Sequence, residues 1–136
     1  KEAIGESVIE SRVHNLRQLL HTCSTQAEPK ARLLAFLDYP IRIRASLTEN
    51  GCPLGTLAYE LAHVDSFLRD SSRGLITEIL DWSTDQFEQM GKTHARSLGL
   101  KFVSQLQGMS LVANTLNDPG IITDMVEQIR QWIESL

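Results

Sequence analysis

The stretch ARSLGLKFVSQLQGMSLVANTL, residues Ala95–Leu116, decides the fold class of this 136-residue chain. Its apolar residues recur at helical spacing and cover most of the circumference of a helix, so this helix must be buried on more than one side. Three small residues, Gly99, Gly108 and Ser110, would let another backbone approach it closely. The stretch therefore predicts a helix packed among other helices.

The segment that follows predicts a last helix with the most regular pattern in the chain. Asn117-Asp118-Pro119-Gly120 is a turn with a fresh helix cap, and apolar residues then recur at threes and fours as far as Leu136. The two C-terminal helices carry more apolar surface than a six-helix monomer of this length hides, so we expect a symmetric homodimer with a four-helix seam. The predicted interface residues are Gly108, Leu111, Val112, Thr115, Met125, Ile129 and Trp132.

Four earlier helices are predicted from the same periodicity. Working back from the C-terminus, the fourth begins after the cap Asp65 and ends at Gly91, and the third begins at Pro53 or Leu54 and ends near His63. The first two run from Glu2 to about Leu20, with an end near Cys23, and from Pro29 into the forties. The sequence thus predicts an all-α six-helix bundle that forms one domain over residues 1–136.

Pro40 interrupts the second of these helices, because an interior proline removes a hydrogen bond and presses on the preceding turn. The alternation of Ile41, Ile43 and Leu47 with polar residues also fits a half-buried strand. A lone strand would find no partner elsewhere in the sequence and would be unstable. A kinked helix is therefore the preferred prediction.

Composition excludes several function classes. The 13 basic and 17 acidic residues give a net charge of −4, which argues against this chain binding nucleic acid by itself. No apolar run is long enough to span a membrane. Two cysteines in a chain of this size favour a reducing compartment, so we expect a cytoplasmic protein. The chain starts at Lys1 in a helical pattern, so we expect it to be the remainder of a longer protein.

The segment NGCPLGTLAYEL, residues 50–61, combines a turn with a helix start. Pro53 suits the first helical position, and this places Cys52 at the N-cap. A thiol there faces free N–H groups and the positive end of the helix dipole, which favour the thiolate. The alternative is a small residue chosen for its fit at a tight turn. The second interpretation is preferred, because helix position alone does not make a thiol reactive.

The sequence indicates neither a metal site nor an active site. His14 and His21 share a helix face, but no spacing supplies the further ligands that a metal needs. There is no nucleophile with a nearby base, no glycine-rich phosphate loop and no carboxylate pair placed by spacing. We therefore expect no enzymatic activity, no metal and no cofactor.

Aromatic and apolar residues on several helices are candidates for lining an effector pocket, a common feature between bundle helices. The O–H of Tyr59 and the N–H of Trp82 can each anchor the polar part of a ligand. The predicted effector-binding residues are Phe36, Cys52, Tyr59, Trp82, Phe102 and Leu106, and Met109 and Phe87 are further candidates. The expected ligand is small and largely apolar or aromatic.

The chain resembles the C-terminal regulatory domain of a TetR-family transcriptional regulator over nearly its whole length. The residues that carry the resemblance are Lys1-Glu2-Ala3-Ile4, Gly51–Leu57 with Glu60-Leu61, Asp81-Trp82 with Gln86-Phe87, and Leu106–Ser110 continuing through Asn114–Pro119. The resemblance implies a homodimeric, usually repressing regulator that binds a small effector. It also implies that operator DNA is bound only through an N-terminal helix-turn-helix domain, which is missing from this chain.

Three other functions stay open at this point. The first is a redox or electrophile sensor of the same fold that acts through Cys52. The second is a helical interaction module with a solid core and no ligand. The third is a small helical enzyme or metal-binding bundle, against which the lack of ligand spacing counts.

Overall fold

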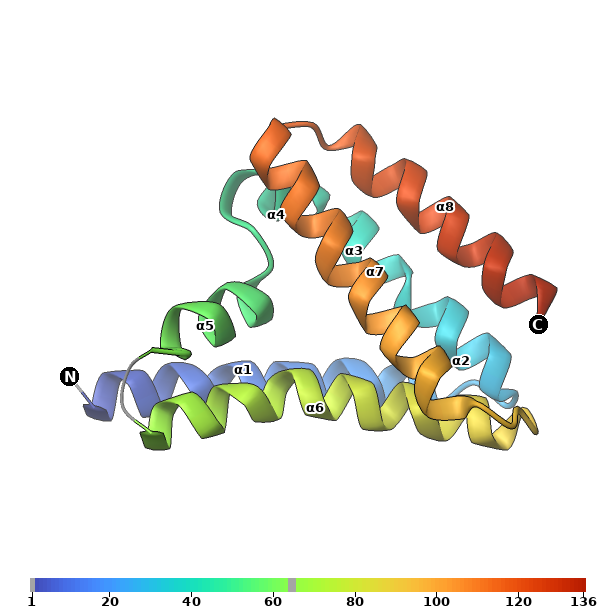
Figure 1. The fold of residues 1–136 in the computed structure, drawn as a ribbon, viewed down its shortest axis with the longest axis horizontal. Helices are drawn as coiled ribbons and strands as arrows, with labels where there is room; N and C mark the ends of the chain where they lie inside the picture. The colour runs from blue at the N-terminus through green and yellow to red at the C-terminus, as the bar shows by residue number, and fades with distance from the viewer. Residues whose placement is uncertain (1, 64–65) are drawn as a thin grey trace.

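The computed structural model describes residues 2–63 and 66–136, and every regular element in these ranges is an α-helix (Figure 1). The predicted all-α class is confirmed. The described helices are α1 (Glu2–Ser24), α2 (Pro29–Phe36), α3 (Asp38–Arg42), α4 (Arg44–Asn50), α5 (Pro53–Leu61), α6 (Ser66–Gln89), α7 (Ala95–Leu116) and α8 (Gly120–Ser135). They amount to the six predicted helices with the second divided into α2, α3 and α4.

Pro40 explains where the second helix breaks. A continuous helix would need an N–H at this position to bond the carbonyl of Phe36, and proline has none. The chain instead ends α2 at Phe36 and starts α3 at Asp38, which puts Pro40 in a first turn, where N–H groups need no helical partner. Ile43, with φ −103° and ψ 16°, then separates α3 from α4. The predicted kink is thus a double break, and residues 41–47 are not a strand.

The predicted ends of the C-terminal helices are confirmed. Asn117 takes the left-handed conformation, with φ 51°, and the N–H of Asp118 donates to the carbonyl of Ala113 at 3.0 Å, which ends α7. The Oδ1 of Asp118 then accepts a hydrogen bond of 2.9 Å from the N–H of Gly120, the first residue of α8. Gly91 follows α6 with a φ of 78°. The predicted cap Asp65 lies outside the described residues.

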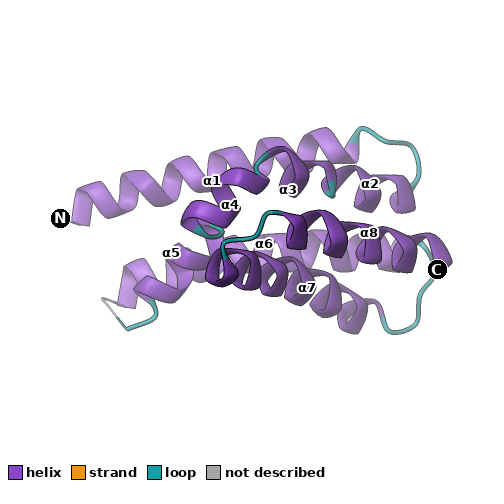
Figure 2. Ribbon diagram, turned by 90° about the horizontal axis from the view of Figure 1, so that it is seen from above, coloured by secondary structure: helices purple, strands orange, loops and turns teal. Residues whose placement is uncertain are grey.

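Two long helices, α1 and α6, lie side by side, and α7 crosses α6 while α8 packs on α7 and α2 (Figures 1 and 2). The crossing of α6 and α7 is close at Gly99, where a Cβ would stand 2.5 Å from the Oγ1 of Thr84. This confirms the close approach predicted for Gly99. The largest fully buried side chains are Phe87, Phe102, Leu33, Leu37, Leu75, Ile122, Ile129 and Ile133.

Candidate functional site

Helix α5 stands apart from the main core. Its N-cap is Cys52 and Pro53 is its first residue, as predicted, and the preceding Gly51 needs its positive φ of 76° for the turn. The helix contacts α6 and spans the space between the α1–α6 pair and α4 with α7 (Figure 1). None of its residues is buried. α5 therefore acts as a wall beside the core rather than as part of it.

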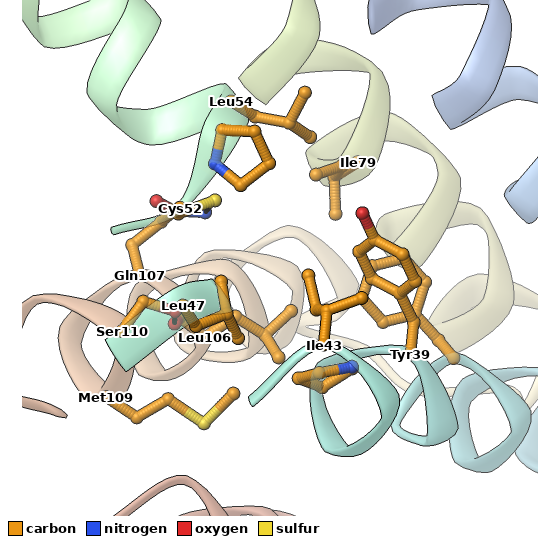
Figure 3. A pocket seen from close by; sticks show the side chains of 13 residues that line it. Tyr39, Ile43, Leu47, Cys52, Leu54, Ile79, Leu106, Gln107, Met109 and Ser110 are labelled. Atoms are coloured by element: carbon orange, nitrogen blue, oxygen red, sulfur yellow. Dashed lines mark hydrogen bonds between the residues drawn. The ribbon is translucent and has the colours of Figure 1, made fainter. Parts of the chain in front are cut away.

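An inner apolar cavity of about 40 Å³ lies where α3, α4 and the start of α5 face α6 and α7 (Figure 3). Its volume suits about three water molecules and is well below that of a typical drug-sized pocket. The lining residues are Phe36, Tyr39, Pro40, Ile43, Leu47, Cys52, Pro53, Leu54, Ile79, Leu106, Gln107, Met109 and Ser110. An apolar molecule must enlarge this cavity in order to enter it.

An outer groove of about 560 Å³ opens between α5 and α7. It is lined by Gly51, Cys52, Gly55, Thr56, Tyr59, Gln107, Ser110, Leu111 and Asn114. Cys52, Gln107 and Ser110 belong to the walls of both spaces. The inner cavity and the outer groove are therefore neighbours with a shared wall.

Hydrogen bonds connect the polar side chains of this wall to their neighbours. The Nε2 of Gln107 donates to the Sγ of Cys52 at 3.5 Å, and the Oε1 of Gln107 occupies the place that a Cβ on residue 55 would take. Gly55 is therefore required for this arrangement. The Oγ of the buried Ser110 donates to the carbonyl of Leu106 at 2.9 Å, back along its own helix.

The lining residues of both spaces are uncharged. Neither lining set contains Asp, Glu, Lys, Arg or His. Burial raises the pKa of Tyr39, and the nearby Cys52 thiol group raises it further by a smaller amount. The Tyr39 hydroxyl therefore stays a neutral hydrogen-bond donor or acceptor at physiological pH. The lining consequently offers apolar surface and neutral hydrogen-bonding groups, and the guanidinium of Arg42 lies behind it, 5.9 Å from the centre of the Tyr39 ring.

Four of the six predicted effector-binding residues line these spaces. Phe36, Cys52 and Leu106 line the inner cavity, as does the further candidate Met109, while Tyr59, with 77% of its surface exposed, lines the outer groove. The other further candidate, Phe87, is fully buried and lines neither space.

Trp82 and Phe102 line neither space, and their predicted role is corrected. Both belong to an aromatic cluster in which the ring of Phe36 lies 5.8 Å from that of Trp82 and 5.6 Å from that of Phe102. The Nε1 of Trp82 donates to the Oγ of Ser24 at 3.0 Å, so this indole N–H is directed to α1. These two rings pack against Phe36, which lines the inner cavity.

Sequence reasoning missed the contribution of α3 and α4. Tyr39, Ile43 and Leu47 reach the inner cavity because the break at Leu37 turns this segment toward α7. Pro40 was the available signal, but a kink alone does not say which way the following residues turn. Gln107 was also missed, since a polar residue on a largely apolar helix carries no sign of its partner.

The predicted dimer-interface residues differ in exposure between α7 and α8. On α7, Gly108, Leu111, Val112 and Thr115 are exposed, with Leu111 at 66%, and no atom lies within 4 Å of a Cβ added to Gly108. These four residues form a stripe at helical spacing that is open to a partner.

The α8 part of the predicted interface is partly wrong. Ile129 is fully buried inside its own chain, because its face of α8 packs on the core, so it is unable to contact a partner. Met125 and Trp132 are half-buried. The ring of Trp132 lies 5.8 Å from that of Phe87 and 4.3 Å from the Nζ of Lys101, which makes it chiefly an intrachain contact.

Comparisons with known proteins give no match: no protein-family model fits the chain, and no curated protein is significantly similar to it in sequence. Within residues 2–63 and 66–136, no group of three or more His, Cys, Asp or Glu side chains is placed to hold a metal ion. None of the helices in this described part has the length and apolarity needed to cross a bilayer.

Proposed function

We propose that this chain is the effector-binding and dimerisation domain of a TetR-like transcriptional repressor. It binds a small, largely apolar molecule in the inner cavity and forms a homodimer through α7. Operator DNA is bound by a separate N-terminal domain of a cytoplasmic protein. The observation that carries the proposal is the apolar inner cavity, which sits between α3, α4, α6 and α7 beside a groove that is open to solvent.

The position of the cavity suits a regulatory role. Its walls come from the broken segment α3–α4 and from α5, and because no residue of α5 is fully buried, α5 is the part of the wall that a ligand can shift at the lowest cost. The opposite wall is formed by Ile79 of α6 and Leu106 of α7. α6 also packs along α1, so a ligand that moves α6 moves the N-terminal helix with it.

A dimer is supported by the stripe on α7. Leu111 and Leu116 keep 66% and 64% of their surface exposed, and Val112 keeps 44%. Large apolar residues grouped on one helix face are typical of an interaction surface. A symmetric pairing of α7 with its copy would bury them without any new element, and because Leu111 also lines the outer groove, this interface would border the groove.

Binding of a neutral aromatic probe to the whole chain tests the proposal. Isothermal titration calorimetry with 4-bromophenol should show saturable binding of one molecule per chain. Leu54→Trp fills the cavity from the first turn of α5 and should weaken binding about tenfold or more. The matched control is Glu60→Trp on the same helix, whose exposed side chain lines neither space and which should bind as the wild type does. Equal binding by all three proteins, or none by the wild type, overturns the proposal.

A further inference from the structure

The inner cavity and the outer groove have part of their walls in common. Cys52, Gln107 and Ser110 face both spaces, and of these only Gln107 has a long flexible side chain. Cys52 is fixed as the N-cap of α5, and Ser110 is buried and bonded to its own helix. Figure 3 shows Cys52, Gln107 and Ser110 together at one side of the inner cavity. Movement of Gln107 alone would therefore join the two spaces.

The contacts that hold Gln107 in place are weak. Its Nε2 donates to a sulfur atom at 3.5 Å, and a thiol sulfur is a weak acceptor. Its Oε1 rests over Gly55, which has no side chain to enclose it. An incoming molecule with its own hydrogen-bonding group can replace the contact with the thiol, so the cost of displacing the amide is small.

The walls also define the charge of the molecule that fits. With no acidic or basic side chain lining the groove, a carboxylate or an ammonium end would give up part of its hydration there without gaining a counter-charge. A neutral hydroxyl or amide end loses much less, because Thr56 and Tyr59 can exchange hydrogen bonds with it in the groove. An apolar body gains by leaving water for the inner cavity, where the flexible Met109 can adapt to its shape.

Resting on the proposed function, we propose that the two spaces are one binding site for an uncharged molecule with an apolar body and one hydrogen-bonding end, and that Gln107 is the partition that moves when it enters. The apolar body occupies the inner cavity and the polar end stays in the groove. The site thereby rejects organic acids and amines of the same shape.

Three octyl compounds that differ only in their end groups test this inference. The chain is labelled with ¹³C at its methionine methyl groups, the Met109 signal is assigned with Met109→Leu, and 1-octanol, octanoate and octylammonium are titrated at pH 7. We expect 1-octanol to shift the Met109 signal saturably with a Kd about tenfold or more below those of both ions. Gln107→Ala and Gly55→Ala should each lower the Kd for 1-octanol about threefold or more, the first by removing the partition and the second by pushing it aside. Gln18→Ala, an exposed glutamine on α1, is the matched control and should leave this Kd unchanged.

The outcomes of these titrations test the charge selection, the role of Gln107 and the proposed function separately. Octanoate or octylammonium binding as tightly as 1-octanol overturns the charge selection, and an unchanged or raised Kd in both Gln107→Ala and Gly55→Ala overturns the partition. If 4-bromophenol binds at the cavity but 1-octanol does not shift Met109, this inference fails while the proposed function stands. If neither compound binds, the proposed function itself fails.

Discussion

The side-chain Nε2 of Gln107 donates a hydrogen bond to the Sγ of Cys52 across 3.5 Å, which joins the middle of α7 to the N-cap of α5. The two residues are 55 positions apart in the sequence. Because α5 contains no fully buried residue, this contact adds to the packing of Leu54 and Leu57 on the core in holding the helix.

Loss of this contact should loosen α5 without unfolding the chain. A hydrogen bond to a thiol sulfur is weak and contributes about 0.5 kcal/mol, so Gln107→Ala should raise the amide hydrogen-exchange rates of residues 54–61 about twofold. Hydrogen exchange followed by mass spectrometry measures this. The control Gln18→Ala should leave these rates as they are, and unchanged rates in Gln107→Ala would mean that the contact does not hold α5.

A charge on the α7 stripe should break the dimer. Leu111→Glu places a carboxylate on the exposed stripe and, in a symmetric pair, brings two such charges into one desolvated interface. We expect the dimer dissociation constant to rise about tenfold or more in sedimentation equilibrium. Ile4→Glu alters a residue of α1 that is 71% exposed and should leave the dimer intact. A Leu111→Glu protein that stays dimeric would place the interface elsewhere.

The crossing of α6 and α7 predicts opposite effects at two glycines. A Cβ at Gly99 would stand 2.5 Å from the Oγ1 of Thr84 and 3.3 Å from its backbone nitrogen, so Gly99→Ala should destabilise the fold by about 1–3 kcal/mol. Gly74 lies within α6 with no atom within 4 Å of such a Cβ, so Gly74→Ala should stabilise it by about 0.5–1 kcal/mol. Urea unfolding compares the two, and a stable Gly99→Ala protein would contradict the close crossing.

Cys23 predicts a loss of stability at high pH. Its side chain is buried, and this burial, with a smaller effect of Asp38, raises the pKa of its thiol from 9.0 to about 11. The unfolded chain releases the thiol proton near pH 9 while the folded chain keeps it, so stability that is complete below pH 9 is lost as the pH rises toward 11. The shift corresponds to about 2–3 kcal/mol.

The matched measurement is the free energy of unfolding of wild type and Cys23→Ala at pH 8 and at pH 11. The advantage of the wild type over the variant should shrink by about 2 kcal/mol across this range, since alanine has no proton to lose. An advantage that stays constant would show that this thiol has an ordinary pKa.

Sequence pattern predicted the long helices closely and the short ones poorly. Residues 95–116 form α7 as expected, since the periodicity and the turn at Asn117 agree on its ends. The path of the chain after Pro29 is harder to predict, because Pro40 indicates where the helix breaks but not the direction of the next segment. That direction follows from the packing of Ile43 and Leu47 against α7, which is a tertiary contact.

The site was predictable only in part for the same reason. Phe36, Leu106 and Cys52 lie near the cavity because apolar residues in the middle of a bundle tend to do so. Trp82 was expected to anchor a ligand, but its N–H has a closer partner in Ser24 at the end of α1. The pairing of Gln107 with Cys52 depends on the absence of a side chain at Gly55. The spacing of apolar residues in the sequence does not predict a contact of this kind.

Locating a bound neutral aromatic molecule tests directly whether the inner cavity is the binding site. Crystals of the chain grown with 4-bromophenol allow the bromine to be located by its anomalous scattering. We expect a bromine peak in the inner cavity, in contact with Leu106 and Met109, with the Gln107 side chain displaced from Cys52. Bromine bound only at the surface, with the inner cavity empty and Gln107 unmoved, would contradict it.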